Sequence, residues 1–249
     1  VVRLTVIGCA GSFPGPDSPA SCYLVEHDGF RLLLDLGNGA LGALQRHIAL
    51  TDIDAIVLSH LHADHVLDMC GLYVAQRYHP DGGRPPIPVW GPRGTAQRLA
   101  RAYDLPEVPG MTGQFEFHDL VEGEERIGPF TVTAARVNHP VEAYGIRLEA
   151  GAHTLAYSGD TAETPALVAL ARDADVALFE ASCLETQPAP GVHLTARQAA
   201  EHAQAAGARI LLLTHLVVWN DPQASLAEAR PAFDGELMLA SSGLVIDVA

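Results

Sequence analysis

The first hundred residues alternate short apolar runs with turns rich in glycine, proline and aspartate. Apolar runs of about four to eight residues, bounded by such turns, are typical of strands. The pattern predicts strands at Arg3–Ile7, Cys22–Glu26, Phe30–Leu36, Ala55–Ser59 and Ile87–Trp90. Asp28-Gly29 is a hairpin signal between two of them, and Gly8–Pro19 reads as a Gly/Pro-rich loop. Longer segments predict helices at Ala40–Ile48, Val66–Tyr78 and Thr95–Tyr103.

The later part of the chain alternates strands with capped helices. Strands are predicted at Phe130–Val137, Tyr144–Glu149, Thr154–Tyr157, Val176–Phe179, Arg209–Leu213, Glu236–Leu239 and Leu244–Val248. Thr164-Pro165 and Asp221-Pro222 each combine an N-cap with proline at the first helical position. Thr195 and Gln198 form a capping box for a helix that ends before Gly207. This order predicts an α/β (α+β) fold in which two sheets pack face to face with helices outside.

Composition limits the classes of partner. With 249 residues and 48% hydrophobic content, residues 1–249 can form one large domain with a full core. The net charge is −15, and all 15 basic residues are arginine. This balance argues against a large nucleic-acid footprint, which needs clustered basic residues. The negative net charge does not exclude a small anionic substrate, because bound metal ions dominate the electrostatic field at their own site.

Cysteine usage and hydropathy predict the compartment. Cys9, Cys22, Cys70 and Cys183 are widely spaced and form no C-x-x-C pair, as expected of reduced thiols. The chain shows neither a basic leader with an apolar core nor an apolar run of about 18 residues. We therefore expect a soluble cytoplasmic protein without a membrane partner.

The segment His60-Leu61-His62-Ala63-Asp64-His65 follows the predicted strand Ala55–Ser59 as a loop. Imidazole and carboxylate are ligands of zinc and related divalent metals. His60 and His62 can face one ion, while Asp64 and His65 face a second. Four ligands on one loop cannot all close around a single ion, so two ions are the natural interpretation. The alternative is an exposed polar loop with incidental histidines.

Three later apolar runs also end in ligand-type residues: His139, Asp160 and His215. Taken singly, His139 could be a loop histidine, Asp160 a helix cap, and His215 a histidine whose ring nitrogens are hydrogen-bonded within the protein. Taken together with the first motif, they predict ligands at the same kind of strand end. The remaining histidines fit no ligand pattern and are expected in surface or capping roles: His27, His47, His79, His118, His153 and His202.

The series HLHADH, NHP, SGDT and LLLTH, in this order, resembles the metallo-β-lactamase superfamily. The resemblance covers nearly the whole chain and implies a four-layer αββα sandwich with a two-metal site at one edge. It implies that one metal binds His60, His62 and His139, and that the other binds Asp64, His65 and His215. Asp160 would bridge the two ions. Zn²⁺ suits these ligands, with Mn²⁺ or Fe²⁺ as alternatives.

Two further segments are similar to the ribonuclease Z-like phosphodiesterase branch: Phe179-Glu180-Ala181-Ser182 and His193-Leu194-Thr195. The resemblance implies that His193 contacts the scissile phosphate or protonates the leaving oxygen, oriented by Glu180. Asp64 would accept a proton from the nucleophilic water. The alternatives are an ordinary histidine before a helix and a structural glutamate.

The chain also departs from ribonuclease Z. The long arm that grips tRNA is missing where we would expect it, since Leu105–Gln114 is short and holds no basic residue. Gly11–Glu26 and Asn138–Tyr144 look closer to bacterial members that open cyclic nucleotides. We expect a phosphodiesterase acting on a small phosphodiester, as a homodimer if it follows the family. The alternatives are a tRNA 3′-end endonuclease, a thioester or lactone hydrolase, and a non-catalytic metal-binding protein.

Overall fold

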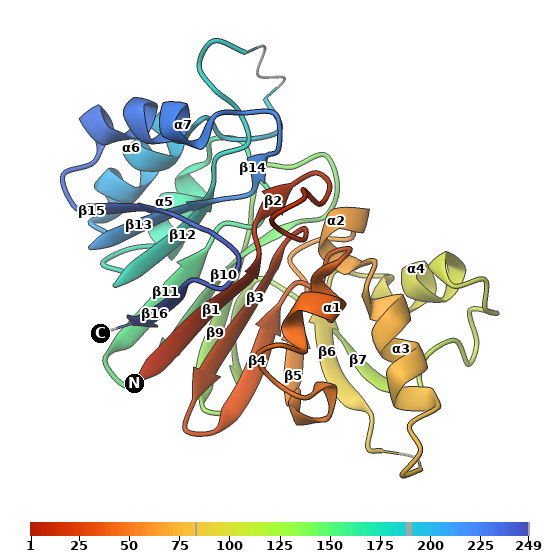
Figure 1. Ribbon diagram of the computed structural model, residues 1–249. Helices are drawn as coiled ribbons and strands as arrows, with labels where there is room; N and C mark the ends of the chain where they lie inside the picture. The colour runs from red at the N-terminus through yellow and green to blue at the C-terminus, as the bar shows by residue number, and fades with distance from the viewer. Residues whose placement is uncertain (83, 188–190, 249) are drawn as a thin grey trace.

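Two β-sheets face one another in the computed structural model, which describes residues 1–82, 84–187 and 191–248 (Figure 1). The first sheet contains β1 (Val2–Gly8), β3 (Cys22–His27), β4 (Phe30–Leu34), β5 (Ala55–Val57), β6 (Ile87–Gly91), β7 (Phe115–Asp119) and β16 (Val245–Val248). The second contains β8 (Gly123–Ile127), β9 (Phe130–Arg136), β10 (Tyr144–Ala150), β11 (His153–Tyr157), β12 (Val176–Glu180), β13 (Ile210–Thr214) and β15 (Glu236–Leu239). A short parallel pair, β2 (Ala10–Gly11) with β14 (Leu216–Val217), lies above them.

Both sheets are mixed in the same way. In the first sheet, the order is β16-β1-β3-β4-β5-β6-β7, antiparallel as far as β4 and parallel beyond it. In the second, the order is β15-β13-β12-β11-β10-β9-β8, parallel as far as β11 and antiparallel beyond it. The inner parallel strands β5, β12 and β13 are wholly buried, as expected when helices cover a sheet on the face opposite the core.

Helices cover the outer face of each sheet (Figure 1). Beside the first sheet lie α1 (Ala40–Leu44), α2 (Ala63–Val66), α3 (Met69–Arg77), α4 (Thr95–Ala102) and the 3₁₀ turn η1 (Leu50–Asp52). Beside the second lie α5 (Pro165–Leu170), α6 (Ala196–Ala206), α7 (Pro222–Ala229) and the 3₁₀ turn η2 (Arg230–Ala232). No helix in the described ranges is long and apolar enough to cross a bilayer.

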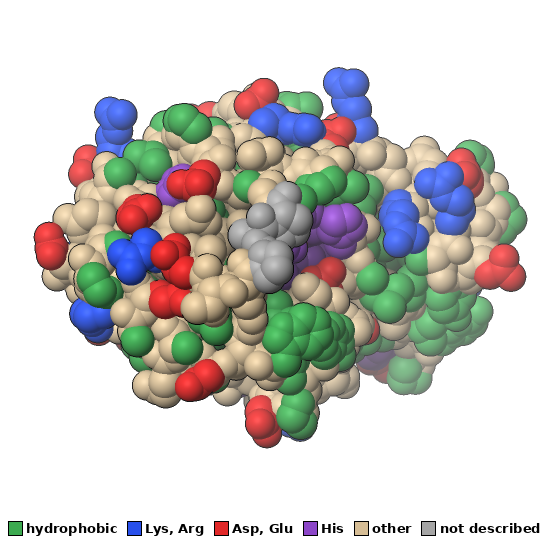
Figure 2. Space-filling model, turned by 90° about the horizontal axis from the view of Figure 1, so that it is seen from above, with side chains coloured by type: hydrophobic (Ala, Val, Ile, Leu, Met, Phe, Trp, Pro, Cys, Tyr) green, Lys and Arg blue, Asp and Glu red, His purple; other side chains and the backbone are tan. Residues whose placement is uncertain are grey.

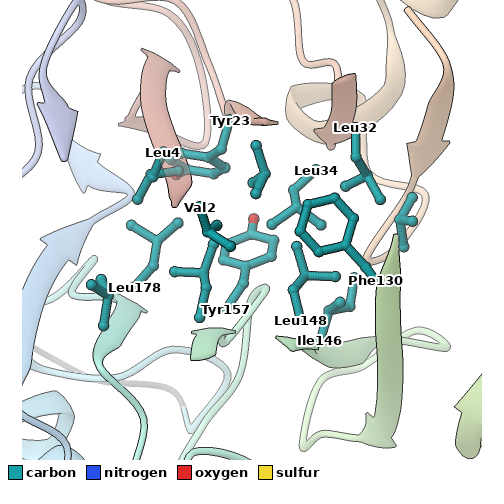
Figure 3. Close-up of a cluster of buried hydrophobic side chains, with 14 of the residues drawn as sticks. Val2, Leu4, Tyr23, Leu32, Leu34, Phe130, Ile146, Leu148, Tyr157 and Leu178 are labelled. Atoms are coloured by element: carbon teal, nitrogen blue, oxygen red, sulfur yellow. The ribbon is translucent and has the colours of Figure 1, made fainter. Parts of the chain in front are cut away.

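The main core lies between the sheets, where side chains from both inner faces interdigitate (Figure 3). Leu4, Tyr23 and Leu34 of the first sheet meet Ile146 and Tyr157 of the second, all at most 2% exposed. Separate apolar clusters join each sheet to its own helices. The layers are therefore helix, sheet, sheet, helix, which confirms the predicted αββα sandwich.

The predicted helix starts are confirmed by their hydrogen bonds. The Thr164 side chain accepts from Ala166 N at 3.3 Å, and the Asp221 side chain accepts from Gln223 N at 2.9 Å. The reciprocal bonds of the capping box between Thr195 and Gln198 are both present. All four cysteines are unpaired.

Three details differ from the predicted elements. Residues 60–78 were predicted as a loop followed by one helix, but they contain two helices. Ala63–Val66 is already helical, and a break at Asp68 separates it from α3. Asp68 is held by tertiary contacts: its N–H donates to Leu36 O, and its carboxylate accepts from Leu41 N. The helix predicted at Ala40–Ile48 ends at Leu44. Strands β7 and β8 were not predicted; β8 is exposed at four of five positions, and its sequence lacks apolar alternation.

Candidate metal centre

Parallel strands of both sheets end at one edge of the sandwich (Figure 1), and most of the candidate ligands directly follow these strands. Asp35 follows β4, His60 follows β5, Asp160 follows β11, Glu180 ends β12 and His215 follows β13. Parallel strands present their carboxyl ends at one edge, which is where α/β sheets place their sites. The strand-end position predicted for His60, Asp160 and His215 is therefore observed.

A first cluster contains His60, His62, His139 and Asp160. Nδ1 of His62 lies 3.0 Å from His60 Nε2 and 3.2 Å from His139 Nε2. Asp160 Oδ2 lies 3.7 Å from His60 Nε2. His139 reaches the cluster from the segment after β9, so the second half of the chain completes a group begun by the 60–65 segment.

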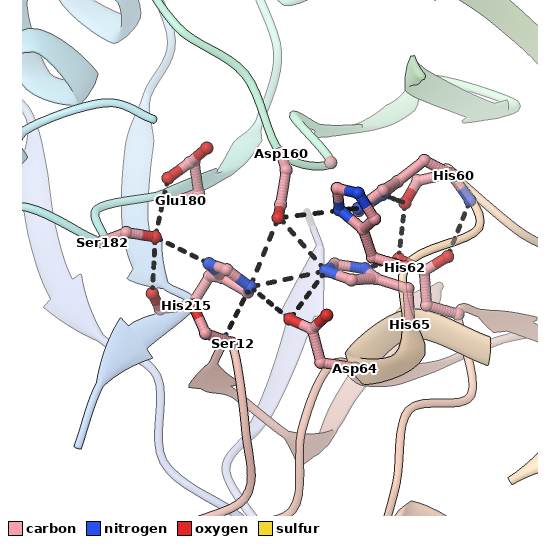
Figure 4. A network of polar contacts seen from close by, with 12 residues as sticks. Ser12, His60, His62, Asp64, His65, Asp160, Glu180, Ser182 and His215 are labelled. Carbon is pink, nitrogen blue, oxygen red and sulfur yellow. Dashed lines mark hydrogen bonds and ion pairs between the residues drawn. The ribbon is translucent and has the colours of Figure 1, made fainter. Parts of the chain in front are cut away.

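A second cluster contains Asp64, His65, Asp160 and His215 (Figure 4). His65 Nε2 lies 3.2 Å from Asp160 Oδ1 and 3.4 Å from His215 Nε2. Asp64 Oδ2 lies 3.1 Å from His215 Nε2. Asp160 belongs to both clusters, with one carboxylate oxygen directed at each, which is the arrangement that the resemblance implied for a bridging ligand.

These residues fit divalent ions. Tetrahedral coordination with Zn–N distances of about 2.0–2.1 Å separates ligand atoms by about 3.3–3.4 Å, close to the spacings in both clusters. Asp160 is 2% exposed, and its Oδ1 has no hydrogen-bond partner among the described residues. The atoms nearest to this Oδ1 are His65 Nε2 at 3.2 Å and His215 Nε2 at 3.4 Å, and a buried carboxylate oxygen without a hydrogen bond is costly unless a cation meets it. The donor set therefore fits the metal sites typical of this fold.

The second ring nitrogens of four histidines are held by protein groups. His60 Nδ1 lies 3.1 Å from Ser59 Oγ, His139 Nδ1 lies 3.1 Å from Val192 O, and His215 Nδ1 lies 2.7 Å from Ser182 Oγ. His65 Nδ1 lies 2.7 Å from Asp35 Oδ2. Such contacts keep the proton on Nδ1 and leave Nε2 free to bind metal.

Asp35 was not predicted as a site residue. It is fully buried at the end of β4 and accepts hydrogen bonds from Ser59 N (2.7 Å), Ser59 Oγ (2.8 Å) and Tyr157 Oη (2.7 Å). Together with the contact to His65, these bonds connect both sheets beneath the site. The available signal was a carboxylate directly after an apolar strand, the same signal that pointed to Asp160.

The side-chain pKa values reflect burial and mutual charge. Burial lowers the pKa of His60 well below its usual value, and neighbouring His65 lowers it further. Burial also opposes protonation of His65, but Asp160 and Asp35 outweigh it and raise the pKa of His65 well above its usual value. Burial favours neutral Asp160, yet His215 and His65 hold its pKa well below the ordinary range.

A third group lies beside these clusters and contains Glu180, His193 and His215. Glu180 is fully buried, and its Oε1 accepts from Thr161 N at 2.6 Å and lies 3.0 Å from His193 Nδ1. Burial disfavours the charged imidazole, but the Glu180 carboxylate overcomes this and raises the pKa of His193 to about 9. The contact between His193 Nδ1 and Glu180 is the predicted pairing of these two residues. The His193 side chain is 20% exposed, and its Nδ1 lies 4.0 Å from Asp160 Oδ2.

Ser182 connects this group to the second cluster. Its hydroxyl donates to Glu180 Oε2 at 2.9 Å and lies 2.7 Å from His215 Nδ1, from which it can accept (Figure 4). One glutamate thus orients His193 directly and His215 through Ser182. Among the histidines without a ligand pattern, His202 has a capping role, because its Nε2 accepts from Thr164 N at 3.2 Å.

The comparisons with known proteins agree with this geometry. The family described as "Beta-lactamase superfamily domain" matches residues 30–216. An uncharacterized protein of Mycobacterium leprae is 42% identical and covers 99% of this chain and 89% of its own. "Probable metallo-hydrolase YhfI" of Bacillus subtilis is 30% identical over 98% of this chain and 99% of its own. The YhfI crystal structure has a TM-score of 0.89 and covers 99% of this chain and 100% of its own.

A ribonuclease Z is also similar. The enzyme of that name from Myxococcus xanthus is 28% identical and covers 100% of this chain and 98% of its own. The αββα architecture, the paired His/Asp clusters and these relatives agree with one another. The chain therefore belongs to the metallo-β-lactamase superfamily, as a metal-dependent hydrolase related to YhfI and ribonuclease Z.

Proposed function

We propose that this protein is a phosphodiesterase that hydrolyses a small phosphodiester, such as a cyclic nucleotide, with two divalent metal ions. The first cluster would hold one ion and the second cluster the other, with Asp160 between them. Zn²⁺ suits five imidazoles and two carboxylates, and Mn²⁺ or Fe²⁺ would also suit them. When bound, the ions supply Lewis-acid stabilisation of the phosphoryl oxygens and lower the pKa of water.

The pairing of His193 with Glu180 is the observation that carries the proposal. A phosphodiester has a poor leaving oxygen, which needs a proton or a hydrogen bond as it departs. His193 is partly exposed beside Asp160, and buried Glu180 holds its Nδ1 at 3.0 Å. His193 therefore acts as the general acid toward the leaving oxygen, while Asp64 accepts a proton from the attacking water. Glu180 is a positioning residue for both His193 and Ser182.

The charge of the chain favours a small substrate over tRNA. The net charge is −15, and residues 105–114, between α4 and β7, contain no basic side chain. An extended RNA needs several Lys or Arg contacts to its phosphates. A small phosphodiester needs only the clusters and His193, although ribonuclease Z is among the relatives.

A substrate panel on Zn²⁺- and Mn²⁺-loaded protein tests this proposal. The panel contains cyclic AMP, bis(p-nitrophenyl) phosphate, a precursor tRNA, a lactone and a thioester. We expect turnover of cyclic AMP and bis(p-nitrophenyl) phosphate and none of the carboxylic substrates. Turnover of the lactone or thioester alone would assign the protein to a different hydrolase class, and cleavage of the tRNA alone would make it an endonuclease.

Three variants separate the acid and its positioning residue from the metal ligands. His193→Ala removes the general acid, so kcat on cyclic AMP should fall about 10²–10⁴-fold while metal content stays at two ions. Glu180→Gln should lower kcat less, because His193 remains but loses its carboxylate partner. Metal content by atomic emission is the control, and Asp160→Asn should reduce it. Wild-type turnover in His193→Ala would contradict the role of His193.

A further inference from the structure

An exposed aromatic pair lies beside the metal centre. The ring centroids of Phe13 and Trp219 are 5.3 Å apart at an interplanar angle of 43°, and Trp219 is 71% exposed. We propose that Phe13 and Trp219 form a stacking subsite for the planar base of a nucleotide phosphodiester whose phosphate lies at the His/Asp clusters. This inference rests on the phosphodiesterase activity proposed above and adds which part of the substrate is recognised, and by which residues.

The backbone holds the pair next to the second cluster. Ser12 N, directly before Phe13, lies 3.3 Å from His215 Nε2, so this backbone lies beside the second cluster. His215 is followed at once by β14, which pairs in parallel with β2 through Ala10–Leu216 and Gly11–Val217. A Cβ at Gly11 would lie 2.4 Å from His215 O, so the close approach of these segments requires glycine.

The segment that carries Trp219 is anchored at its other end by Asn220. Asn220 is 7% exposed; its Nδ2 donates to Ser182 O at 2.9 Å, and its Oδ1 accepts from Gln187 Nε2 at 2.5 Å. Its N–H donates to Val217 O at 2.9 Å. The backbone on either side of Trp219 is therefore held while the indole remains open to solvent. A preorganised platform of this kind loses little entropy when a ligand binds.

The size of the patch favours a base over a protein partner. Among the described residues, its exposed large hydrophobic side chains are Phe13, Val218 and Trp219. Three side chains provide much less than the ~800 Å² per partner that a stable protein interface buries. One heteroaromatic ring matches an aromatic pair in size, and base–aromatic stacking is a common means of binding nucleotides. From above, hydrophobic side chains border the hollow in which the histidines are exposed (Figure 2).

Calorimetric titration of the Zn²⁺-loaded protein with 5′-AMP and with ribose 5-phosphate tests the subsite without relying on turnover. Trp219→Leu should raise the Kd for 5′-AMP about 5- to 100-fold, the range expected for one lost base stack. Trp219→Phe keeps an aromatic ring and should weaken 5′-AMP less. The Kd for ribose 5-phosphate should be the same in all three proteins, because it has a phosphate but no base.

The matched control is Tyr78→Ala, which removes another exposed aromatic side chain (68% exposed) at the end of α3. It should leave both Kd values unchanged. An unchanged Kd for 5′-AMP in Trp219→Leu would overturn the inference. So would sedimentation in which the wild type is a dimer and that variant a monomer, because this result would assign the pair to an interface between copies. Failure of the wild type on every phosphodiester would refute the proposed function instead, and the AMP titration would still decide whether a base binds.

Discussion

Asp35 shows how one buried side chain determines the chemistry of its neighbour. It accepts bonds from Ser59 and Tyr157 and lies 2.7 Å from His65 Nδ1, so the only proton of a neutral His65 is directed away from the clusters. Histidine ligands depend on such partners for their tautomer. A residue that binds neither metal nor substrate in our proposal therefore determines whether His65 can be a ligand at all.

Replacing Asp35 by asparagine tests this dependence. The amide NH₂ of Asp35→Asn can donate to His65 Nδ1, which moves the proton to Nε2 and blocks the metal-facing lone pair. Metal affinity should fall about 10- to 100-fold by competition with a chelating dye. Asp54→Asn is the matched control, because Asp54 also accepts a backbone bond, from Arg31 N, but lies outside the clusters. Equal affinities in both variants would contradict the role of Asp35.

At the scale of elements, the turn before α1 and the short helix α2 are packed without room for a side chain. A Cβ at Gly37 would lie 2.0 Å from the carbonyl oxygen of Asp64, while Gly37 N–H donates to Ser21 O at 2.9 Å. The contact is backbone to backbone, so no rotamer change can relieve it. The position of Asp64 in the second cluster thus depends on a glycine 27 residues earlier in the chain, between β4 and α1.

Gly37→Ala should therefore displace α2, lowering both the melting temperature and the metal affinity. Gly42→Ala, in the same region, should have the opposite effect on the melting temperature. A Cβ at Gly42, within α1, meets nothing within 4 Å. That change should stabilise the protein by about 0.5–1 kcal/mol through the higher helix propensity of alanine. Thermal unfolding and metal titration of both variants give the comparison. A shift of the same sign in the two would refute the steric argument.

At the scale of the whole molecule, the clusters join the two halves of the sandwich. His60, His62, Asp64 and His65 follow β5 of the first sheet, whereas His139, Asp160 and His215 belong to the second half of the chain. Bound ions would therefore stabilise the native arrangement of both sheets. A ligand at 100 times its Kd adds about 2.7 kcal/mol to the free energy of unfolding, so a chelator should lower the melting temperature.

The pH dependence of the metal-free protein follows from His65 and His193. The pKa of His193 is raised from 6.5 to about 9, and that of His65 is also raised. A raised pKa in the folded state contributes stability that is complete below the unfolded value and is lost as pH rises through the folded value. After chelation, the melting temperature should fall between pH 6.5 and 9. His193→Gln should flatten this decline, and a metal-free melting temperature that rises over the window would contradict it.

The sequence by itself determined the layers of the fold and the seven candidate ligands that meet at the site, but not Asp35. Alternating apolar runs and capped helices such as Thr195–Ala206 are local signals of strands and helices. Ligand-type residues that follow strands indicate that these residues meet at one edge of the sheets. Other features depended on tertiary contacts. The break at Asp68 and the role of Asp35 both arise from partners distant in the chain. The pairing of Phe13 with Trp219 likewise required β2 and β14 to lie side by side, which no local pattern encodes.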